Sequence, residues 1–359
     1  METIEEYKVV RIINEEPEFC EGHKANVLVN FFILCEEGKT VLGQNVHELE
    51  ICGVSLINWV SRVCDDRPKI LPIQTDGDVI STIRPYVDYH ADYSVVLFAD
   101  TPLINKSHLE DLIEFVDRRR MNVCKLKRGF VFKNEYIQYN DEFYSIDEYD
   151  FASDDFLVVN DSESLALAKN VLSKRIVDFH KRNNVQFENE NMVNVDANVQ
   201  IGEGTKIASG VSIVRGAQVA QNCNIERNAN ISGSTIGGNS RIGDSSSIVD
   251  SIVKNAVFVG SSVMVKDSVI GNNAIIETKS SIVSSSLRES VILKAFVVVD
   301  EGRIGECAIV NKHSRILGLT DRSVIGASSE IGANVEIVDS VIESNSFIEN
   351  NSKILNKVE

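Results

Sequence analysis

The feature that most restricts the fold of this chain is a branched aliphatic residue that returns every five or six positions from Val195 to Ile354. From Ile236 onward a longer interval of seventeen residues also appears. Neither helical nor simple strand periodicity gives this pattern, whereas a hexapeptide repeat does, and three hexapeptides form one turn of a parallel β-helix. The residues in register are Val195, Ile201, Ile207, Ile213, Val219, Ile225, Ile231, Ile236, Ile242, Ile248, Val253, Val259, Val265, Ile270, Ile276, Ile282, Leu287, Leu293, Val299, Ile304, Val310, Ile316, Ile325, Ile331, Ile337, Ile342, Ile348 and Ile354.

The repeat also predicts the dimensions and corners of this β-helix. At three aliphatic residues a turn the pattern predicts about nine coils, and one strand spacing a coil gives a prism of roughly 43 Å. A small residue often follows the aliphatic one, and recurrent Asp-Ser-Ile-Val and Asp-Ser-Val-Ile strings mark a shortened corner. The rhythm breaks at residues 317–320, which we interpret as a short insertion at one corner.

Composition limits the partners and the compartment. A chain of 359 residues is long enough for two domains. Its formal charge of −17 would repel nucleic acid and anionic membranes, which argues against both as partners. The seven cysteines form no CxxC pair, which argues against zinc and a disulfide framework and favours a reducing compartment. No signal-type or membrane-spanning apolar stretch is evident. The sequence therefore predicts a soluble, cytoplasmic protein.

The first 160 residues alternate between strand and helix patterns. Buried strands are expected at 26–35 and 93–99, and helices at 54–63 and 106–120. Ser107 is the expected N-cap of the latter helix, with Glu110 three residues later in a capping-box arrangement. Strand–loop–helix units in this order predict an α/β layer with a mainly parallel sheet.

A long amphipathic helix is expected at 162–182, with Asn160 or Asp161 as its cap. It divides the chain into an α/β domain at 1–161, a connecting helix and linker at 162–192, and the β-helix at 193–359.

Asp100 is the first candidate for chemistry, because it follows the clearest strand and α/β sheets place ligands at the carboxyl ends of their strands. A carboxylate there could hold Mg²⁺ together with a substrate phosphate. The alternative is that Asp100 only shapes the loop before Pro102. Asn160 and Asp161 carry the same ambiguity, since capping the following helix explains both.

Two strings resemble one enzyme family. Leu97-Phe-Ala-Asp-Thr-Pro-Leu-Ile104 is similar to the GDxPL segment of sugar-1-phosphate nucleotidyltransferases. The stretch at 158–176, which opens Val-Val-Asn-Asp, resembles the end of the catalytic domain of the bacterial bifunctional UDP-N-acetylglucosamine pyrophosphorylase / glucosamine-1-phosphate N-acetyltransferases. The resemblance implies a nucleotidyltransferase-like (Rossmann-like) α/β domain followed by a left-handed parallel β-helix, and a homotrimer. It also implies Mg²⁺ bound by Asp100 and Asn160, with UTP and N-acetylglucosamine-1-phosphate as substrates.

The chain departs from that family in the loop that cradles nucleotide phosphates. A glycine-rich loop with an arginine is expected there, and residues 34–41 read Leu-Cys-Glu-Glu-Gly-Lys-Thr-Val instead. Gly38 remains and Lys39 could partly replace the arginine, so these two are the candidate nucleotide-binding residues. Glu36 and Glu37 would repel phosphate. We therefore expect nucleotidyl transfer to be reduced or lost.

Acetyl transfer is not expected either, and no acetyl-CoA site is predicted. The HLSYxGD and NYDGxxK groups of the resembling acetyltransferases are missing, and His313, the sole histidine in the repeats, reads as a surface residue. Three hypotheses remain open: a divergent Mg²⁺-dependent nucleotidyltransferase, a non-catalytic scaffold or sugar-nucleotide-binding relative, and an acyltransferase with a different residue set around His313.

Overall fold

The computed structural model describes residues 27–64, 68–74, 77–142, 147–149, 154–320 and 322–356. The chain forms two compact units, Met1–Leu172 and Ser173–Glu359. The division falls inside α5 (Ser162–Arg182), the helix expected to connect the two domains. Across the described ranges, none of the helices combines the length and the hydropathy needed to span a bilayer.

The first unit is built on a six-stranded sheet with the order β10-β8-β9-β7-β1-β6. β1 lies between β6 and β7 and is parallel to both, but β9 runs antiparallel to β7 and β8. The expectation of a mainly parallel sheet therefore holds for β6, β1 and β7 and fails at β9, because a two-residue turn joins β8 to β9 as a hairpin. The strands are β1 (Val29–Glu36), β6 (Lys69–Ile73), β7 (Tyr93–Phe98), β8 (Val123–Leu126), β9 (Gly129–Lys133) and β10 (Asp147–Glu148).

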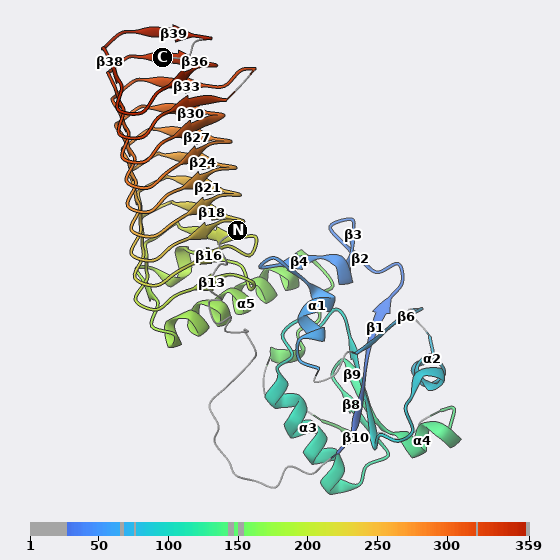
Figure 1. Ribbon diagram of the computed structural model, residues 1–359. Helices are drawn as coiled ribbons and strands as arrows, with labels where there is room; N and C mark the ends of the chain where they lie inside the picture. The colour runs from blue at the N-terminus through green and yellow to red at the C-terminus, as the bar shows by residue number, and fades with distance from the viewer. Residues whose placement is uncertain are drawn as a thin grey trace. The chain divides into compact units, whose positions relative to one another are not determined.

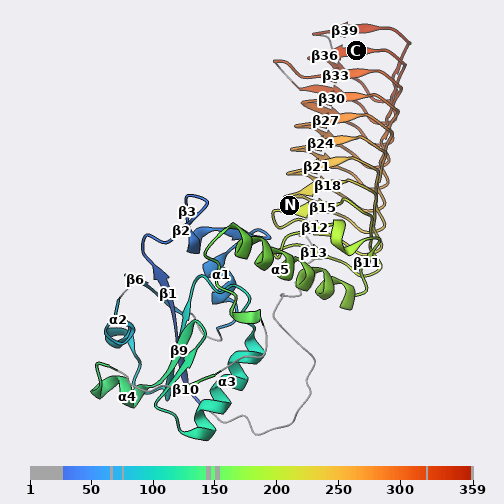
Figure 2. The ribbon, with the colours of Figure 1, turned by 180° about the vertical axis from the view of Figure 1, so that it is seen from behind.

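Helices cover both faces of this sheet, because successive side chains of β1 point to opposite sides. Phe31 and Ile33 pack in one apolar cluster with residues of α1 and α3, and Phe32 and Leu34 pack in another with α2 and α4. Figures 1 and 2 show α3 on one face and α2 and α4 on the other. The helices are α1 (Leu56–Ser61), α2 (Val79–Ile83), α3 (Lys106–Arg119) and α4 (Asn134–Tyr139), with short 3₁₀ turns η1 (Val46–Glu48), η2 (Arg84–Tyr86) and η3 (Asp154–Phe156).

Two small ribbons and two helix caps complete the first unit. β2 (Thr40–Val41) pairs with β3 (Gln44–Asn45), and β4 (Glu50–Ile51) pairs with β5 (Val54–Ser55). The N-cap of α3 is Asn105, not Ser107, because the Asn105 side chain accepts the backbone N–H of Ser107 at 2.9 Å. For α5 the expected Asp161 is the cap, and its carboxylate accepts the N–H of Ser164 at 2.7 Å.

The second unit is a parallel β-helix of hexapeptide repeats, as the sequence predicts, and Figure 1 shows its coils stacked up to β39. Its three sheets contain ten, ten and nine strands. One is β11 (Gln186–Phe187), β14 (Lys206–Ile207), β17 (Asn224–Ile225), β20 (Arg241–Ile242), β23 (Phe258–Val259), β26 (Ile275–Ile276), β29 (Ile292–Leu293), β32 (Ile309–Val310), β35 (Glu330–Ile331) and β38 (Phe347–Ile348).

The second and third sheets take the next strands of each coil. The second is β12 (Asn194–Val195), β15 (Ser212–Val214), β18 (Asn230–Ser232), β21 (Ser247–Val249), β24 (Met264–Lys266), β27 (Ser281–Val283), β30 (Val298–Asp300), β33 (Arg315–Leu317), β36 (Glu336–Val338) and β39 (Lys353–Leu355). The third is β13 (Gln200–Ile201), β16 (Gln218–Val219), β19 (Thr235–Ile236), β22 (Ile252–Val253), β25 (Val269–Ile270), β28 (Ser286–Leu287), β31 (Gly302–Ile304), β34 (Ser323–Ile325) and β37 (Val341–Ile342).

Every aliphatic residue of the repeat points into the prism, with at most 9% of its surface exposed. The sequence missed β11, which precedes the first counted repeat and carries Phe187 where an aliphatic residue is expected. The 3₁₀ turn η4 (Glu190–Met192) separates β11 from β12.

Buried serines at the shortened corner form hydrogen bonds from one coil to the next. The Ser234 hydroxyl accepts the N–H of Ser251 at 3.0 Å, the Ser251 hydroxyl that of Ser268 at 3.1 Å, and the Ser268 hydroxyl that of Ser285 at 3.0 Å. A hydroxyl at this place satisfies a backbone donor that water cannot reach. This is the physical reason for the recurrent serine in the sequence.

The insertion at 317–320 lies at one corner and is held by Asp339 of the next coil. The Asp339 carboxylate accepts the N–H groups of Leu319 at 2.6 Å and Thr320 at 3.0 Å, and the Thr320 hydroxyl at 2.9 Å. The Leu319 side chain is 72% exposed. The insertion is therefore an ordered corner whose tip faces solvent.

Candidate functional site

Gly38, Lys39 and Asp100 lie at one edge of the sheet of the first unit. β1 and β7 are parallel neighbours with Leu34 opposite Phe98. The turn after β1, which contains Gly38 and Lys39, and the loop after β7, which contains Asp100, therefore leave the sheet side by side.

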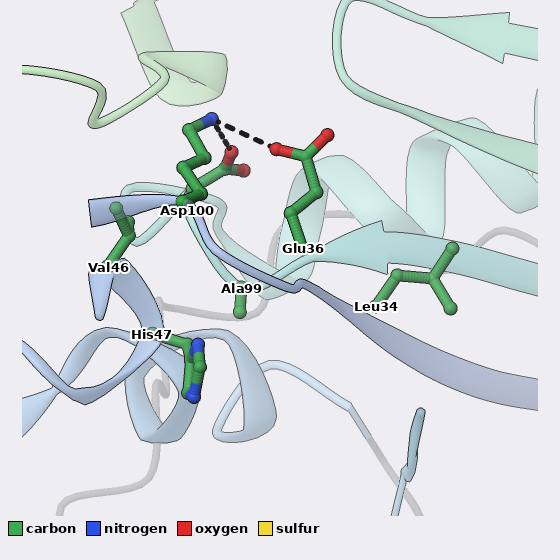
Figure 3. Close-up of a pocket in the computed structure, with 7 residues that line it drawn as sticks. Leu34, Glu36, Val46, His47, Ala99 and Asp100 are labelled. Atoms are coloured by element: carbon green, nitrogen blue, oxygen red, sulfur yellow. Dashed lines mark hydrogen bonds and ion pairs between the residues drawn. The ribbon is translucent and has the colours of Figure 1, made fainter. Parts of the chain in front are cut away.

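The ammonium group of Lys39 contacts two carboxylates. Its Nζ lies 2.6 Å from Oδ2 of Asp100 and 3.3 Å from Oε2 of Glu36. Figure 3 shows both carboxylates turned toward this nitrogen, beside a small recess lined on its apolar side by Leu34, Val46 and Ala99. The positive charge expected to meet a nucleotide phosphate is thus already matched by acidic groups of the chain.

Arg128 completes the site, although no motif in the sequence singles it out. Its Nη2 lies 2.9 Å from Oδ2 of Asp100 and 2.7 Å from Oε2 of Glu36, and its Nε lies 3.3 Å from Oδ1 of Asp100. The guanidinium also lies over the Phe98 ring, 3.9 Å from its centroid. We call Glu36, Lys39, Asp100 and Arg128 the four-charge cluster.

The register of the β8–β9 hairpin is what brings Arg128 to this edge. Gly129 lies opposite Leu97 of β7, so the preceding residue reaches the carboxyl end of that strand. Gly129 has a φ of +141°, and a Cβ there would lie 2.5 Å from the carbonyl oxygen of Val96. A Lys-Arg-Gly string between two short strand patterns is the signal that could have identified the turn.

Burial makes the four-charge cluster strong. Asp100 and Glu36 have only 5% and 12% of their side-chain surface exposed, and their two negative charges face two positive ones. Burial alone would lower the pKa of Arg128, but the hydrogen bonds and charges of Asp100 and Glu36 raise it above its usual value. The cluster is neutral as a whole and every member has an opposite partner.

Cys35, at the end of β1, is not a candidate nucleophile. Burial, and then the charge of Asp100, raise the pKa of its thiol to about 11. The thiolate is the reactive form of cysteine, so this side chain stays protonated and inert near neutral pH.

The segments of Asp100 and Asn160 are adjacent, because the N–H of Val159 donates to the carbonyl oxygen of Asp100 at 2.8 Å. The Asn160 side chain, however, accepts the Ser164 hydroxyl at 3.2 Å, and the Asp161 carboxylate caps α5. In the described part of the chain, no three His, Cys, Asp or Glu side chains converge as a metal site.

As arranged, Asp100 and Asn160 do not fit a divalent cation. An ion at the Asp100 carboxylate would face the Lys39 ammonium at the same oxygen atom, and like charges at such distances repel strongly in a half-buried site. The assignment of Asp100 and Asn160 as Mg²⁺ ligands therefore stays a prediction from resemblance.

Gly38 serves the turn after β1. Its φ of +76° lies in the left-handed region that other residues adopt at a cost, and the space that a Cβ would occupy is open. The structure thus explains this glycine by backbone conformation alone.

His313 lies on the surface of the β-helix. Its backbone has a φ of +61°, and its ring stacks on Phe296 with centroids 4.8 Å apart and planes 16° apart. An imidazole that acts as a general base needs to reach the proton it removes. Here the ring contacts an aromatic face at an exposed corner.

Comparisons with known proteins do not assign a family to this chain. No family model and no curated protein matches it. Among solved structures, the UDP-N-acetylglucosamine acyltransferase from Campylobacter jejuni is 22% identical with a TM-score of 0.25, covering 38% of this chain and 64% of its own. LpxA from Acinetobacter baumannii is 15% identical with a TM-score of 0.22, covering 41% and 65%. The chain thus spans less than two thirds of each of these two structures.

Proposed function

We propose that this protein is a non-catalytic relative of the sugar-1-phosphate nucleotidyltransferases that acts as an oligomeric scaffold. Its first unit would be a Rossmann-like domain of UDP-N-acetylglucosamine pyrophosphorylase type that no longer transfers a nucleotidyl group. The β-helix would supply a rigid surface for assembly. The observation that carries the proposal is the four-charge cluster.

The cluster supports loss of catalysis because it uses each charged group that a nucleotide would need. Phosphates would have to compete with Glu36 and Asp100 for Lys39 and Arg128, and they would meet two carboxylates at the same place. A catalytic metal would have to displace Lys39 from Asp100. Breaking a buried charge pair leaves an uncompensated charge and costs about 3–5 kcal/mol. A ligand would have to offset that cost before any useful binding.

Acyl transfer is a weaker candidate. The fold of the second unit is compatible with a hexapeptide-repeat acyltransferase, and His313 would be the base. The stacking of its ring on Phe296 favours a surface role instead.

The test is nucleotidyl transfer by the full chain. Pyrophosphate release would be followed with Mg²⁺, a panel of nucleoside triphosphates and a panel of sugar 1-phosphates that includes N-acetylglucosamine-1-phosphate. We expect the unmodified chain to release pyrophosphate no faster than the Asp100→Ala variant does. Turnover that Asp100→Ala abolishes and Asp111→Ala preserves would overturn it, since Asp111 is an exposed carboxylate on α3 of the same unit.

The resemblance also leads us to propose a homotrimer built through the β-helix. Light scattering on the full chain tests it, and a mass equal to a single chain over a wide concentration range would contradict it.

A further inference from the structure

One sheet of the β-helix carries an apolar ladder on its outer surface. The outward residues of β23, β26, β29 and β32 are Phe258, Ile275, Ile292 and Ile309, and each lies opposite the next in the strand register. Phe258 and Ile275 are 37% and 39% exposed, and Ile292 and Ile309 are half-buried. We call these four residues the apolar ladder.

The fold does not require this ladder. The core is formed by the inward neighbours, among them Val259 and Ile276, which are completely buried. Earlier strands of the same sheet place Lys206 and Asn224 at the outward position. Four neighbouring apolar side chains at positions that are polar elsewhere in the same sheet indicate a contact surface.

Opposite charges close the two ends of the apolar ladder. Arg241 of β20 lies opposite Phe258 in the register, and Glu330 of β35 lies opposite Ile309. Both side chains are exposed. Read along the prism axis from β20 to β35, the outward positions are therefore one cation, four apolar residues and one anion. Beyond Glu330 the next outward residue is Phe347 of β38, which is 65% exposed.

We propose that this face binds the same face of a second copy of the chain, with the two prisms antiparallel about a two-fold axis. The axis runs along the strands between β26 and β29, so it reverses the order of the coils and keeps each position along the strand. Ile275 then meets Ile292 of the second copy, and Arg241 meets its Glu330. An isologous two-fold contact requires such a self-complementary surface.

A second column of charges fits the same axis. Glu277 follows β26 and Lys294 follows β29, and within one chain they form an ion pair at 2.9 Å. The two-fold operation places Glu277 of each copy opposite Lys294 of the other. A parallel arrangement of the two faces would instead stack Arg241 on Arg241 and Glu330 on Glu330. Charge complementarity thus selects the antiparallel dimer.

The dimer interface is narrow. Five strand steps from β20 to β35 span about 24 Å, which is small for a specific interface. Each copy also carries a formal charge of −17, so repulsion opposes the approach. We therefore expect a reversible dimer whose population rises with protein concentration. The proposal does not depend on the absence of catalysis.

The test is sedimentation velocity of the full chain over a range of concentrations at physiological salt. The expected result is a doubling of mass, from one chain to two or from three chains to six. Ile275→Lys abolishes the doubling, whereas Ile252→Lys, at an exposed outward position of another sheet, leaves it intact. Circular dichroism verifies that each variant is folded.

Charge reversal makes the test sharper. Arg241→Glu and Glu330→Arg each place like charges together and raise the dimer dissociation constant by at least about tenfold. The double variant restores opposite charges in exchanged places and returns the constant to within about threefold of the original. Absence of doubling in the unmodified chain, no effect of either single reversal, or a double variant weaker than both singles would overturn the proposal. A mass fixed at three chains would remove the two-fold contact and leave the homotrimer standing.

Discussion

Removing the carboxylate of Asp100 tests whether the four-charge cluster is structural. Asp100→Ala takes away one hydrogen bond to Lys39 and two to Arg128, and leaves both cations with Glu36 alone. A structural role predicts destabilisation of the first unit. If Asp100 served catalysis instead, its replacement would leave the stability of the first unit nearly unchanged or raise it.

The size of the effect follows from burial. Breaking a fully buried charge pair costs about 3–5 kcal/mol. The Lys39 and Arg128 side chains are 24% and 23% exposed, so water recovers part of their solvation. We expect a loss of about 2–3 kcal/mol in the free energy of unfolding of the first unit. With a urea m-value of about 2 kcal/mol/M, the midpoint falls by about 1–1.5 M.

The chain contains one tryptophan, which makes the measurement specific. Trp59 lies on α1 of the first unit, and its indole N–H donates to the carbonyl oxygen of Ile51 at 3.0 Å. Its fluorescence follows the unfolding of that unit separately from the β-helix. Asp111→Ala serves as the control, since it removes an exposed carboxylate of the same unit. A midpoint unchanged or raised by Asp100→Ala would refute the reasoning.

Three further predictions concern the β-helix unit, each read by far-UV circular dichroism or proteolysis. His180 is 2% exposed, burial lowers the pKa of its imidazole to about 4, and no described group bonds its Nε2. Between pH 6.5 and 4 the unfolded chain therefore binds a proton at His180 that the folded chain does not bind. The free energy of unfolding accordingly falls by about 2 kcal/mol from pH 7.5 to 5. His180→Leu should flatten this dependence, and an unchanged slope would contradict it. Ser251→Ala leaves the backbone N–H of Ser268 without its acceptor and should cost about 1–3 kcal/mol, whereas replacement of an exposed serine should cost little. Asp339→Ala releases the corner at 317–320 and should speed tryptic cleavage at the exposed Arg322, with an unaltered cleavage rate as the contrary result.

The β-helix could be predicted because its information is local and periodic. One side chain of every strand must enter a narrow prism, and this leaves a five- or six-residue periodicity in the sequence. All of the register residues from Val195 to Ile354 are accordingly buried. The strand β11 escaped because Phe187 replaces the aliphatic residue there.

The site of the first unit was only partly predictable. The sequence was enough to place Lys39 and Asp100 each in a loop that follows a strand, and the parallel pairing of β1 with β7 brings the two loops together. The contact of Asp100 with Arg128 depends on the antiparallel pairing of β9 with β7, which no local pattern specifies. Because this pairing was not predicted, the sequence did not indicate that Asp100, an expected metal ligand, contacts both Lys39 and Arg128. The N-cap of α3 differs for a smaller reason, because Asn105 and Ser107 are both good capping residues and only the backbone angle decides between them.

We propose that no metal enters the four-charge cluster to which Asp100 belongs. Crystals of the full chain soaked with Mn²⁺ and UTP test it most directly, because manganese gives an anomalous signal and takes the oxygen ligands that Mg²⁺ takes. We expect no anomalous peak at Asp100, with Lys39 and Arg128 still in contact with its carboxylate. A manganese ion bound to Asp100 and Asn160, with Lys39 displaced, would contradict the account.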